Sequence, residues 1–164
     1  MRATGSGVVA VFAVTREETV ICIEQFRPAI VPIEQYRIAR PLHALGLIAG
    51  LCDVQGEEAS DAAVRELREE AGCVADQWVE VPMQAECAGV TDGIVRVWLA
   101  LNARRVLQPR LDGSEVALGL RQIELPLAEL PQALLQYHRE TGNVVDPKLM
   151  ACRGWYEHFT GRRF

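Results

Sequence analysis

The sequence lacks the excess of basic residues that binding to nucleic acid or to an anionic membrane surface requires. Lys and Arg number 17 against 22 Asp and Glu, which gives a formal charge of −5. It also lacks an apolar run near the roughly 18 residues that a membrane span needs, and its start, MRATGSG, does not have the segments of a secretory leader. We therefore expect a protein that binds neither nucleic acid nor membrane, and that holds anionic ligands through local cations or metal.

The sequence also lacks a cysteine framework. Its five cysteines are odd in number and form no CxxC pair, and most of them lie in apolar stretches. Disulfide scaffolds and zinc sites need paired or regularly spaced ligands, and the three histidines show no zinc spacing either. We therefore expect buried thiols in the reducing cytoplasm, and we assign no role to His43, His138 and His158.

The length and the amino-acid composition of the chain are those of a folded domain. The chain has 164 residues, of which 49% are apolar and 24% charged, and we expect residues 1–164 to form a single domain. Strand-like and helix-like segments alternate without a strict βαβ rhythm. This order predicts an α/β protein in which helices cover a mixed sheet.

Hydrophobic patterns place the elements along the chain. Apolar runs rich in β-branched residues predict strands, the first two joined as a hairpin, at 7–14, 19–25, 78–81 and 94–101. Helical periodicity predicts helices over 60–71 and 127–139 and a final one that opens near residue 146. Turn residues predict an exposed loop over 107–115.

The ends of the helices carry recognisable signals. Ser60 is expected to cap the first helix and Gly72 to stop it, while Gly142 should stop the second. The last helix is expected to open at Asp146 as cap, with Pro147 in its first turn. Apolar residues at helical spacing predict its buried face, namely Leu149, Cys152, Tyr156 and Phe159.

Three acids in the first predicted helix are the most informative feature. Glu66, Glu69 and Glu70 are spaced i, i+3 and i+4, so they share about one third of the helix circumference. One interpretation is a solvated charged face in which Arg65 and Glu69 pair. The other is a site for a hard cation, because Mg²⁺ prefers carboxylate oxygens that it shares with waters and substrate phosphates. Helical spacing alone leaves both open.

The surrounding residues favour the second interpretation. The segment resembles the Nudix box of the Nudix hydrolases, G-x5-E-x7-R-E-U-x-E-E-x-G-U with U aliphatic, at Gly50, at Glu57 and along the run from Arg65 to Cys73. Two positions depart from the pattern. Six residues, instead of five, separate Gly50 from Glu57, and Cys73 stands in place of the final aliphatic residue.

The resemblance implies a fold, a reaction and a metal. Nudix hydrolases have an α/β/α sandwich around a mixed sheet, and water attacks phosphorus in their substrates, which link a nucleoside diphosphate to another moiety. Carried over by position, the ligands for Mg²⁺ or Mn²⁺ would be Glu66, Glu70, Glu69 and the backbone carbonyl of Ala49. Such metals neutralise the diphosphate and activate water, so an acidic protein is no obstacle.

The same resemblance implies roles for residues around the metal site. Arg65, oriented by Glu57, would hold the box glutamates. In the group of ADP-ribose pyrophosphatases and nucleotide-sugar hydrolases, a glutamate on a loop after the box can act as general base. The matching residue here is Glu115, with Glu69 as its rival.

The likeness to that group rests on further segments. They include Ala49-Gly50-Leu51 and the near-duplicated Glu24-Gln25-Phe26-Arg27 and Glu34-Gln35-Tyr36-Arg37. Arg27 and Arg37 would grip phosphate or stack on a base, and Tyr36 would stack on the base. A homodimer is expected from the resemblance, with residues 24–43 at its interface.

Two alternatives to an ADP-ribose hydrolase stay open. One is a catalytically silent Nudix domain that binds a nucleotide as a sensor or interaction module. The other keeps the chemistry and changes the substrate to GDP-mannose, NADH or a dinucleoside polyphosphate, because loops that the motif does not include determine specificity.

Overall fold

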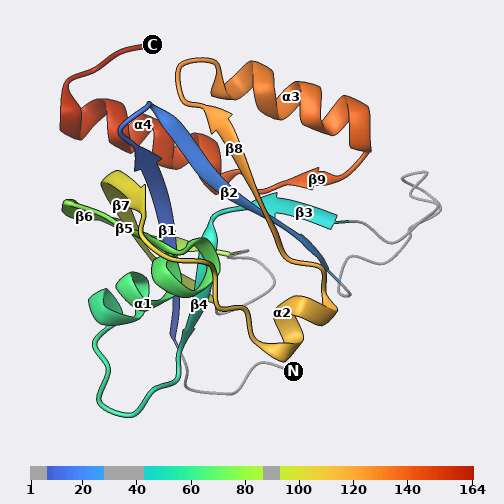
Figure 1. Cartoon of the computed structure of the whole chain (residues 1–164). Helices are drawn as coiled ribbons and strands as arrows, with labels where there is room; N and C mark the ends of the chain where they lie inside the picture. Colours follow the sequence, from blue (N-terminus) through green and yellow to red (C-terminus); the bar gives the residue numbers. More distant parts are fainter. Residues whose placement is uncertain (1–6, 28–42, 87–92) are drawn as a thin grey trace. The chain divides into compact units, whose positions relative to one another are not determined.

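The structure, a computed structural model, describes residues 7–27, 43–86 and 93–164. Its chain forms two compact units, each with its own strands and helices (Figure 1). The first unit comprises Met1–Glu17 and Ile48–Arg110, and the second comprises Glu18–Leu47 and Leu111–Phe164.

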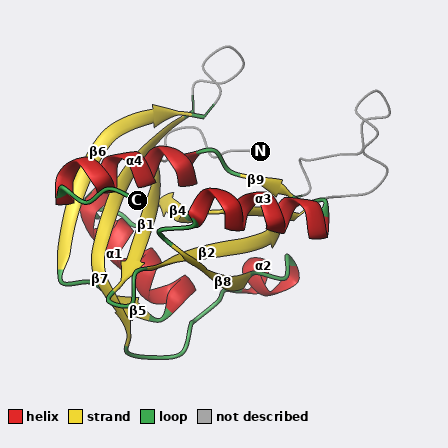
Figure 2. Ribbon diagram, turned by 90° about the horizontal axis from the view of Figure 1, so that it is seen from above, coloured by secondary structure: helices red, strands yellow, loops and turns green. Residues whose placement is uncertain are grey.

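The first unit is built on a mixed set of strands around β1. Strand β4 pairs with β1 antiparallel, with Gly7 opposite Cys52, and β7 pairs with β1 parallel, with Val8 opposite Val95. Strand β6 lies antiparallel beside β7 (Figure 2), and the short β5 pairs with the end of β7. The strands are β1 (Gly7–Thr15), β4 (Ile48–Cys52), β5 (Cys73–Val74), β6 (Gln77–Ala85) and β7 (Ile94–Arg105).

Strand β1 explains why its sequence is apolar without alternation. The run from Val9 to Val14 is at most 2% exposed at every position, so both faces of the strand are covered. Helix α1 (Ala59–Ala71) contacts β1 and β4. The structure confirms the strands predicted at 7–14 and 94–101, and it extends the one predicted at 78–81 in both directions.

Helix α1 confirms the predicted helix but not its cap. Glu58 is the N-cap residue, and its carbonyl accepts hydrogen bonds from the amides of Asp61 and Ala62. Ser60 therefore lies inside the first turn, and its prediction as the cap is wrong. Gly72 ends the helix as expected, with φ of 65°, a left-handed conformation that glycine adopts without a steric penalty.

The second unit has its own mixed set of strands around β2. Strands β3 and β8 flank β2 and are both antiparallel to it, and the short β9 runs parallel to β3. Helix α3 contacts β8 and β9. The elements are β2 (Thr19–Phe26), β3 (His43–Gly46), α2 (Gly113–Ala117), β8 (Arg121–Pro126), α3 (Leu130–Thr141), β9 (Val144–Val145) and α4 (Lys148–Thr160).

The exposed loop predicted over 107–115 is wrong at its end, because Gly113–Ala117 form the short helix α2. The Asp112 carboxylate accepts hydrogen bonds from the amides of Ser114 and Glu115, at 2.7 and 2.8 Å. The Glu115 carboxylate accepts one from the Asp112 amide at 2.6 Å. This reciprocal capping box stabilises the start of α2. The turn residues Pro109 and Gly113 had favoured a loop there instead.

The predicted second helix occurs as α3, which begins at Leu130 instead of residue 127 and ends at Gly142 as expected. In α4, the cap is Pro147 instead of Asp146, although the Asp146 carboxylate still accepts a hydrogen bond from the amide of Lys148 at 2.9 Å. The cap prediction is therefore wrong by one residue.

The buried face of α4 differs from the prediction at one position. Leu149, Cys152 and Tyr156 are buried as expected, and Arg153 joins them. Phe159 is 47% exposed, because it lies at the margin of this stripe in the last turn. Three cysteines, Cys22, Cys73 and Cys152, are buried thiols as predicted, Cys52 is half-buried, and Cys87 lies outside the described residues.

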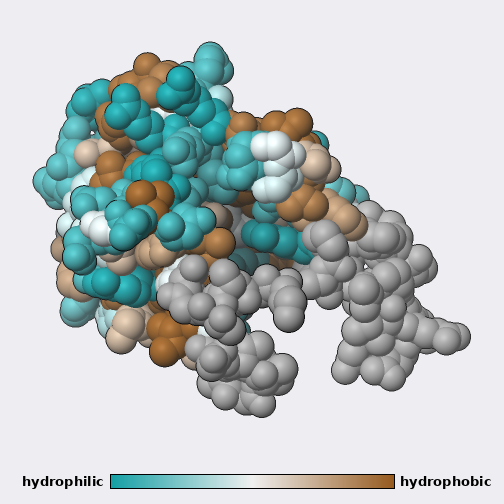
Figure 3. Space-filling view, turned by 90° about the horizontal axis from the view of Figure 1, so that it is seen from below, coloured by the Kyte–Doolittle hydropathy of each residue, from teal (hydrophilic) through white to brown (hydrophobic). Residues whose placement is uncertain are grey.

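Some large apolar side chains also reach the surface, among them Met83, Val116 and Ile94. Figure 3 shows hydrophobic residues scattered between hydrophilic ones on the face that it presents. None of the helices in the described part of the chain combines the length and the apolar character that crossing a bilayer requires.

Candidate functional site

Two carboxylates of α1 are buried on the helix face that packs in the first unit. Glu66 is 6% and Glu70 5% exposed, on the same face as Ala62, Ala63 and Leu67. A carboxylate oxygen of Glu66 lies within 4.8 Å of one of Glu70. Burying two like charges this close together costs free energy unless cations or hydrogen-bond donors compensate them.

Strand β4 supplies part of that compensation. The backbone amide of Ala49 donates to Glu70 Oε2 at 3.2 Å. The next residue, Gly50, makes room for the other acid, because a Cβ at this position would lie 2.0 Å from the Glu66 carboxylate carbon. The glycine of the box motif thus lets the strand backbone and a helix carboxylate approach each other directly.

Arg65 ties together the helix, the strand and the preceding loop. Its Nε and Nη2 donate to the two carboxylate oxygens of Glu57 at 2.9 and 3.1 Å, and Nη2 also donates to the Leu51 carbonyl at 2.9 Å. Its Nη1 donates to Glu66 Oε1 at 2.6 Å and to Glu69 Oε2 at 3.0 Å. One planar guanidinium therefore holds three carboxylates in a defined arrangement.

The electrostatics of this group follow from its contacts. Hydrogen bonding to Glu57, and then to Glu69 and Glu66, raises the pKa of Arg65. In return, the hydrogen bonds from Arg65 hold the pKa of Glu57 below its ordinary value. The contact between Glu57 and Arg65 that the resemblance implies is therefore present.

The extra residue between Gly50 and Glu57 is accommodated in a turn. The amide of Glu57 donates to the carbonyl of Val54 at 3.1 Å, and Gly56 adopts φ of 81°. Because glycine takes this left-handed conformation freely, the longer loop still delivers the Glu57 carboxylate to Arg65.

The third acid of the helix has a different environment. The Glu69 side chain is 43% exposed, and its pairing with Arg65 is the contact that the solvated-face interpretation predicts. That interpretation is wrong for Glu66 and Glu70, which are buried. The helix therefore carries two buried carboxylates, Glu66 and Glu70, and a third, half-exposed one at Glu69.

The donor chemistry of this face fits a divalent cation. Glu66, Glu70 and Glu69 offer hard oxygen atoms, and oxygens of the first two lie within 4.8 Å of each other, so these residues would hold a divalent cation. Arg65 and the Ala49 amide orient the acids from behind, as ligands of a metal site require.

The remaining predicted residues belong to the second unit or lie outside the described residues. Glu115 is half-buried in α2 of the second unit, where its carboxylate binds the Asp112 amide. Arg27 is exposed directly after β2. Tyr36 and Arg37 lie outside the described residues, as does most of the near-duplication over 24–43.

Sequence reasoning missed a third buried acid, Glu24 of β2, which is 2% exposed. Arg121 Nε donates to its Oε1 at 2.6 Å, the Tyr137 hydroxyl donates to its Oε2, and the Asn143 amide donates to the Tyr137 oxygen at 3.1 Å. Burial, and then the contact with Glu24, raises the pKa of Tyr137 to about 12. The available signal was an acid inside an apolar strand.

Comparison with known proteins places the chain in a family. Residues 6–145 match the NUDIX domain. The chain is 35% identical over 104 residues to the ADP-ribose pyrophosphatase of Mycobacterium tuberculosis, covering 63% of this chain and 49% of that protein. It is 37% identical over 94 residues to the ADP-ribose pyrophosphatase of Bacillus subtilis, covering 57% and 45%. The chain thus spans about half the length of these curated relatives.

The fold has a counterpart among solved structures. The crystal structure of an ADP compounds hydrolase matches with a TM-score of 0.55 at 22% identity, over 80% of this chain and 64% of that one. At this identity the likeness concerns the fold, and the predicted α/β class with mixed strand pairing is confirmed. Since the matched domain covers most of the chain, including α1 and its acids, the protein belongs to the NUDIX domain family.

Proposed function

We propose that this protein is a hydrolase that cleaves the diphosphate linkage of a nucleoside diphosphate derivative, with ADP-ribose or a related nucleotide sugar as substrate. Its cofactor would be Mg²⁺ or Mn²⁺. The observation that carries this proposal is the buried pair Glu66 and Glu70, held beside Arg65 within a matched NUDIX domain. The names of the two curated relatives support the choice of substrate.

The reaction needs an attacking water and a leaving phosphate. The water oxygen forms a bond to one phosphorus, the bond from that phosphorus to the bridging oxygen breaks, and the bridging oxygen leaves with the other phosphate. The products are a nucleoside monophosphate and a phosphorylated second moiety. The metal would neutralise the diphosphate and polarise its oxygens. The chain itself would hold the carboxylates in place through Arg65, so that little reorganisation accompanies the reaction.

Two carboxylates compete for the role of general base. Glu69 is half-exposed and adjoins the buried pair, but Arg65 Nη1 already engages its carboxylate at 3.0 Å. Glu115 binds a backbone amide, and it would have to release that contact before it took a proton. The Glu69→Gln and Glu115→Gln variants separate these roles, because loss of the base removes the acidic limb of the pH profile of kcat.

The proposal includes the parts of the chain that would meet the substrate. Arg27, Arg37 and Tyr36 are proposed to bind the phosphates and the base. We further propose that residues 1–164 act as one domain, that the protein is a cytoplasmic homodimer, and that residues 24–43 lie at its interface. Light scattering tests the dimer, and deletion of one ten-residue copy within 24–43 should change the mass that it measures.

The decisive experiment is a hydrolysis assay on purified protein. ADP-ribose, GDP-mannose, NADH and a dinucleoside polyphosphate are incubated with Mg²⁺, with Mn²⁺ or with EDTA, and the products are separated by chromatography. We expect AMP and ribose 5-phosphate from ADP-ribose, and no product in EDTA. If no substrate is cleaved while ADP-ribose binds tightly in calorimetry, the chain is a nucleotide-binding module instead.

A further inference from the structure

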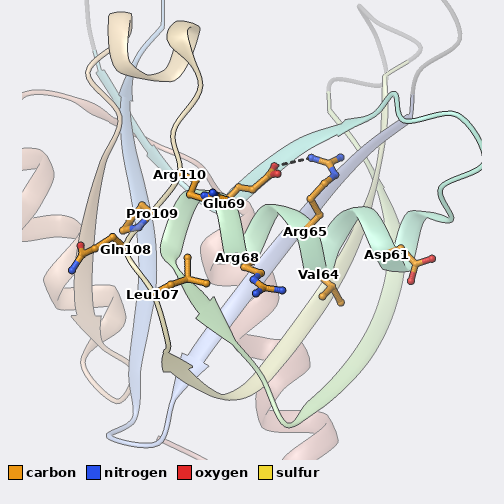
Figure 4. A pocket seen from close by; sticks show the side chains of 9 residues that line it. All are labelled: Asp61, Val64, Arg65, Arg68, Glu69, Leu107, Gln108, Pro109 and Arg110. Atoms are coloured by element: carbon orange, nitrogen blue, oxygen red, sulfur yellow. Dashed lines mark hydrogen bonds and ion pairs between the residues drawn. The ribbon is translucent and has the colours of Figure 1, made fainter.

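A groove lies along α1 within the first unit, and its lining includes Arg65 and Glu69, which adjoin the buried acids. It runs between the helix and the segment from Leu107 to Arg110, and its volume is about 840 Å³ (Figure 4). That volume falls in the range of roughly 300–1,000 Å³ that small-molecule sites occupy. Its lining residues are Asp61, Val64, Arg65, Arg68, Glu69, Leu107, Gln108, Pro109 and Arg110.

The two walls of the groove are fastened to each other. The Gly72 carbonyl accepts hydrogen bonds from the amides of Val106 and Leu107 at 2.9 and 3.1 Å, and the Arg110 amide donates to the Glu69 carbonyl at 2.7 Å. A Cβ on residue 72 would lie 2.1 Å from the Leu107 carbonyl oxygen. Glycine at this position therefore allows the close approach, and the groove is formed before any ligand arrives.

The charges of the groove do not balance locally. Arg65 and Glu69 are paired with each other. Among the described residues, no hydrogen bond or ion pair engages the side chains of Arg68 and Arg110, and Asp61 is the one further acid of the lining. Two guanidinium groups that line one preformed cavity offer planar sets of donors for an oxyanion.

The rest of the lining has a different chemistry. Val64 is 44% exposed, and Leu107 and Pro109 are partly exposed beside it. Figure 4 shows Val64 and Arg68 projecting from the same side of the helix, with the Leu107 segment running alongside. A ligand that contacts both kinds of side chain carries an anionic group and a less polar body.

We propose that this groove binds an organic phosphate monoester, with its phosphate between Arg68 and Arg110 and its organic part against Val64 and Leu107. The groove shares Arg65 and Glu69 with the proposed catalytic face, but the residues proposed to hold the phosphate here are arginines, whereas the carboxylates of the catalytic face would attract phosphate only through a metal. Binding in the groove requires neither metal nor hydrolysis. Its failure and that of the proposed function are therefore independent.

The test is calorimetric titration in EDTA, where the carboxylate face repels phosphates. The probes are AMP, ribose 5-phosphate and inorganic phosphate, and the double variant is Arg68→Ala with Arg110→Ala. Arg139→Ala is the matched control, because it removes an exposed arginine from another helix, α3. We expect both esters to bind more tightly than inorganic phosphate. The double variant should bind them at least about tenfold more weakly, and the control should bind like the wild type.

Two further measurements distinguish a lost binding site from unfolding and from the proposed catalytic face. Circular dichroism verifies that the double variant is folded, and Glu70→Gln should retain ester binding in EDTA even where it abolishes hydrolysis. Three results would overturn the proposal: no ester binding by the wild type at millimolar concentration, equal binding by the double variant, or loss of binding in Glu70→Gln.

Discussion

Each unit of the molecule contains buried carboxylates, but their hydrogen-bond partners differ between the two units. In the second unit, the single carboxylate of Glu24 has Arg121 on one oxygen and the Tyr137 hydroxyl on the other. In the first unit, Glu66 and Glu70 lie together, and Arg65 divides its donors among Glu66, Glu69 and Glu57.

This difference separates structural acids from functional ones. A buried acid matched by a cation and neutral donors stabilises the fold, and removal of its charge leaves the donors unsatisfied. A buried pair of like charges opposes folding, so its charge has to be useful elsewhere. The comparison predicts opposite effects for the same chemical change, Glu to Gln, in the two units.

The largest expected effect is on activity at Glu70. Glu70→Gln keeps the size and the hydrogen bonding of the side chain but removes a ligand charge. It should therefore lower the kcat for ADP-ribose hydrolysis by on the order of 100-fold or more. The free energy of unfolding should stay equal or rise, because a like-charge repulsion disappears. Steady-state kinetics and urea unfolding check the two parts, and an active Glu70→Gln would contradict the assignment.

The next effect concerns Gly50, where the strand meets the acid. Gly50→Ala places a methyl group on the Glu66 carboxylate, so the side chain has to move. We expect a loss of activity of about tenfold or more and a destabilisation of about 1–3 kcal/mol. Gly154→Ala in α4 is the matched control, because its Cβ meets nothing within 4 Å and it should stabilise the helix slightly. Equal behaviour of the two variants would remove the reason given for this glycine.

The reverse experiment is Glu24→Gln. Because Arg121 and Tyr137 would lose a charged acceptor, we expect a destabilisation of about 1–3 kcal/mol in urea unfolding. Activity below the melting transition should be retained. Glu140→Gln, an exposed acid of α3, serves as the control and should change stability little. A stable but inactive Glu24→Gln would move this acid from the structural class to the functional one.

The smallest effect is on the pH dependence of stability. Glu57 has a lower pKa in the folded protein than its ordinary value of 4.5, so its ion pair with Arg65 contributes fully above that value. The contribution is lost as the pH falls through the folded-state pKa. The difference in unfolding free energy between wild type and Glu57→Gln should be constant near neutral pH and shrink below about pH 4.5. A difference that stays the same from neutral to acidic pH would contradict this prediction.

The sequence predicted those features that local spacing determines. The helix over Glu66 to Glu70, its stop at Gly72 and the contact of Glu57 with Arg65 were accessible, because each depends on periodicity or on a motif. Caps were less accessible. Ser60 has a suitable side chain, but the loop enters the helix at Glu58, so the first hydrogen bonds begin there.

Features that depend on distant segments could not be predicted. The contacts of Glu24 with Arg121 and Tyr137 join residues about 100 positions apart, so no local pattern reveals them. The groove beside α1 likewise depends on a distant segment, because the chain comes back to the helix end at Leu107, whose amide donates to the Gly72 carbonyl. The helix α2 was different, because its capping box was visible in the sequence and was outweighed by turn residues.

The central claim is that the buried acids of α1 bind a divalent cation and that Glu24 does not. Titration with Mn²⁺, followed by electron paramagnetic resonance of the free ion, measures this directly for wild type, Glu70→Gln and Glu24→Gln. We expect the affinity for Mn²⁺ to fall about tenfold or more in Glu70→Gln and to stay at the wild-type value in Glu24→Gln. Undiminished Mn²⁺ binding by Glu70→Gln would contradict this claim.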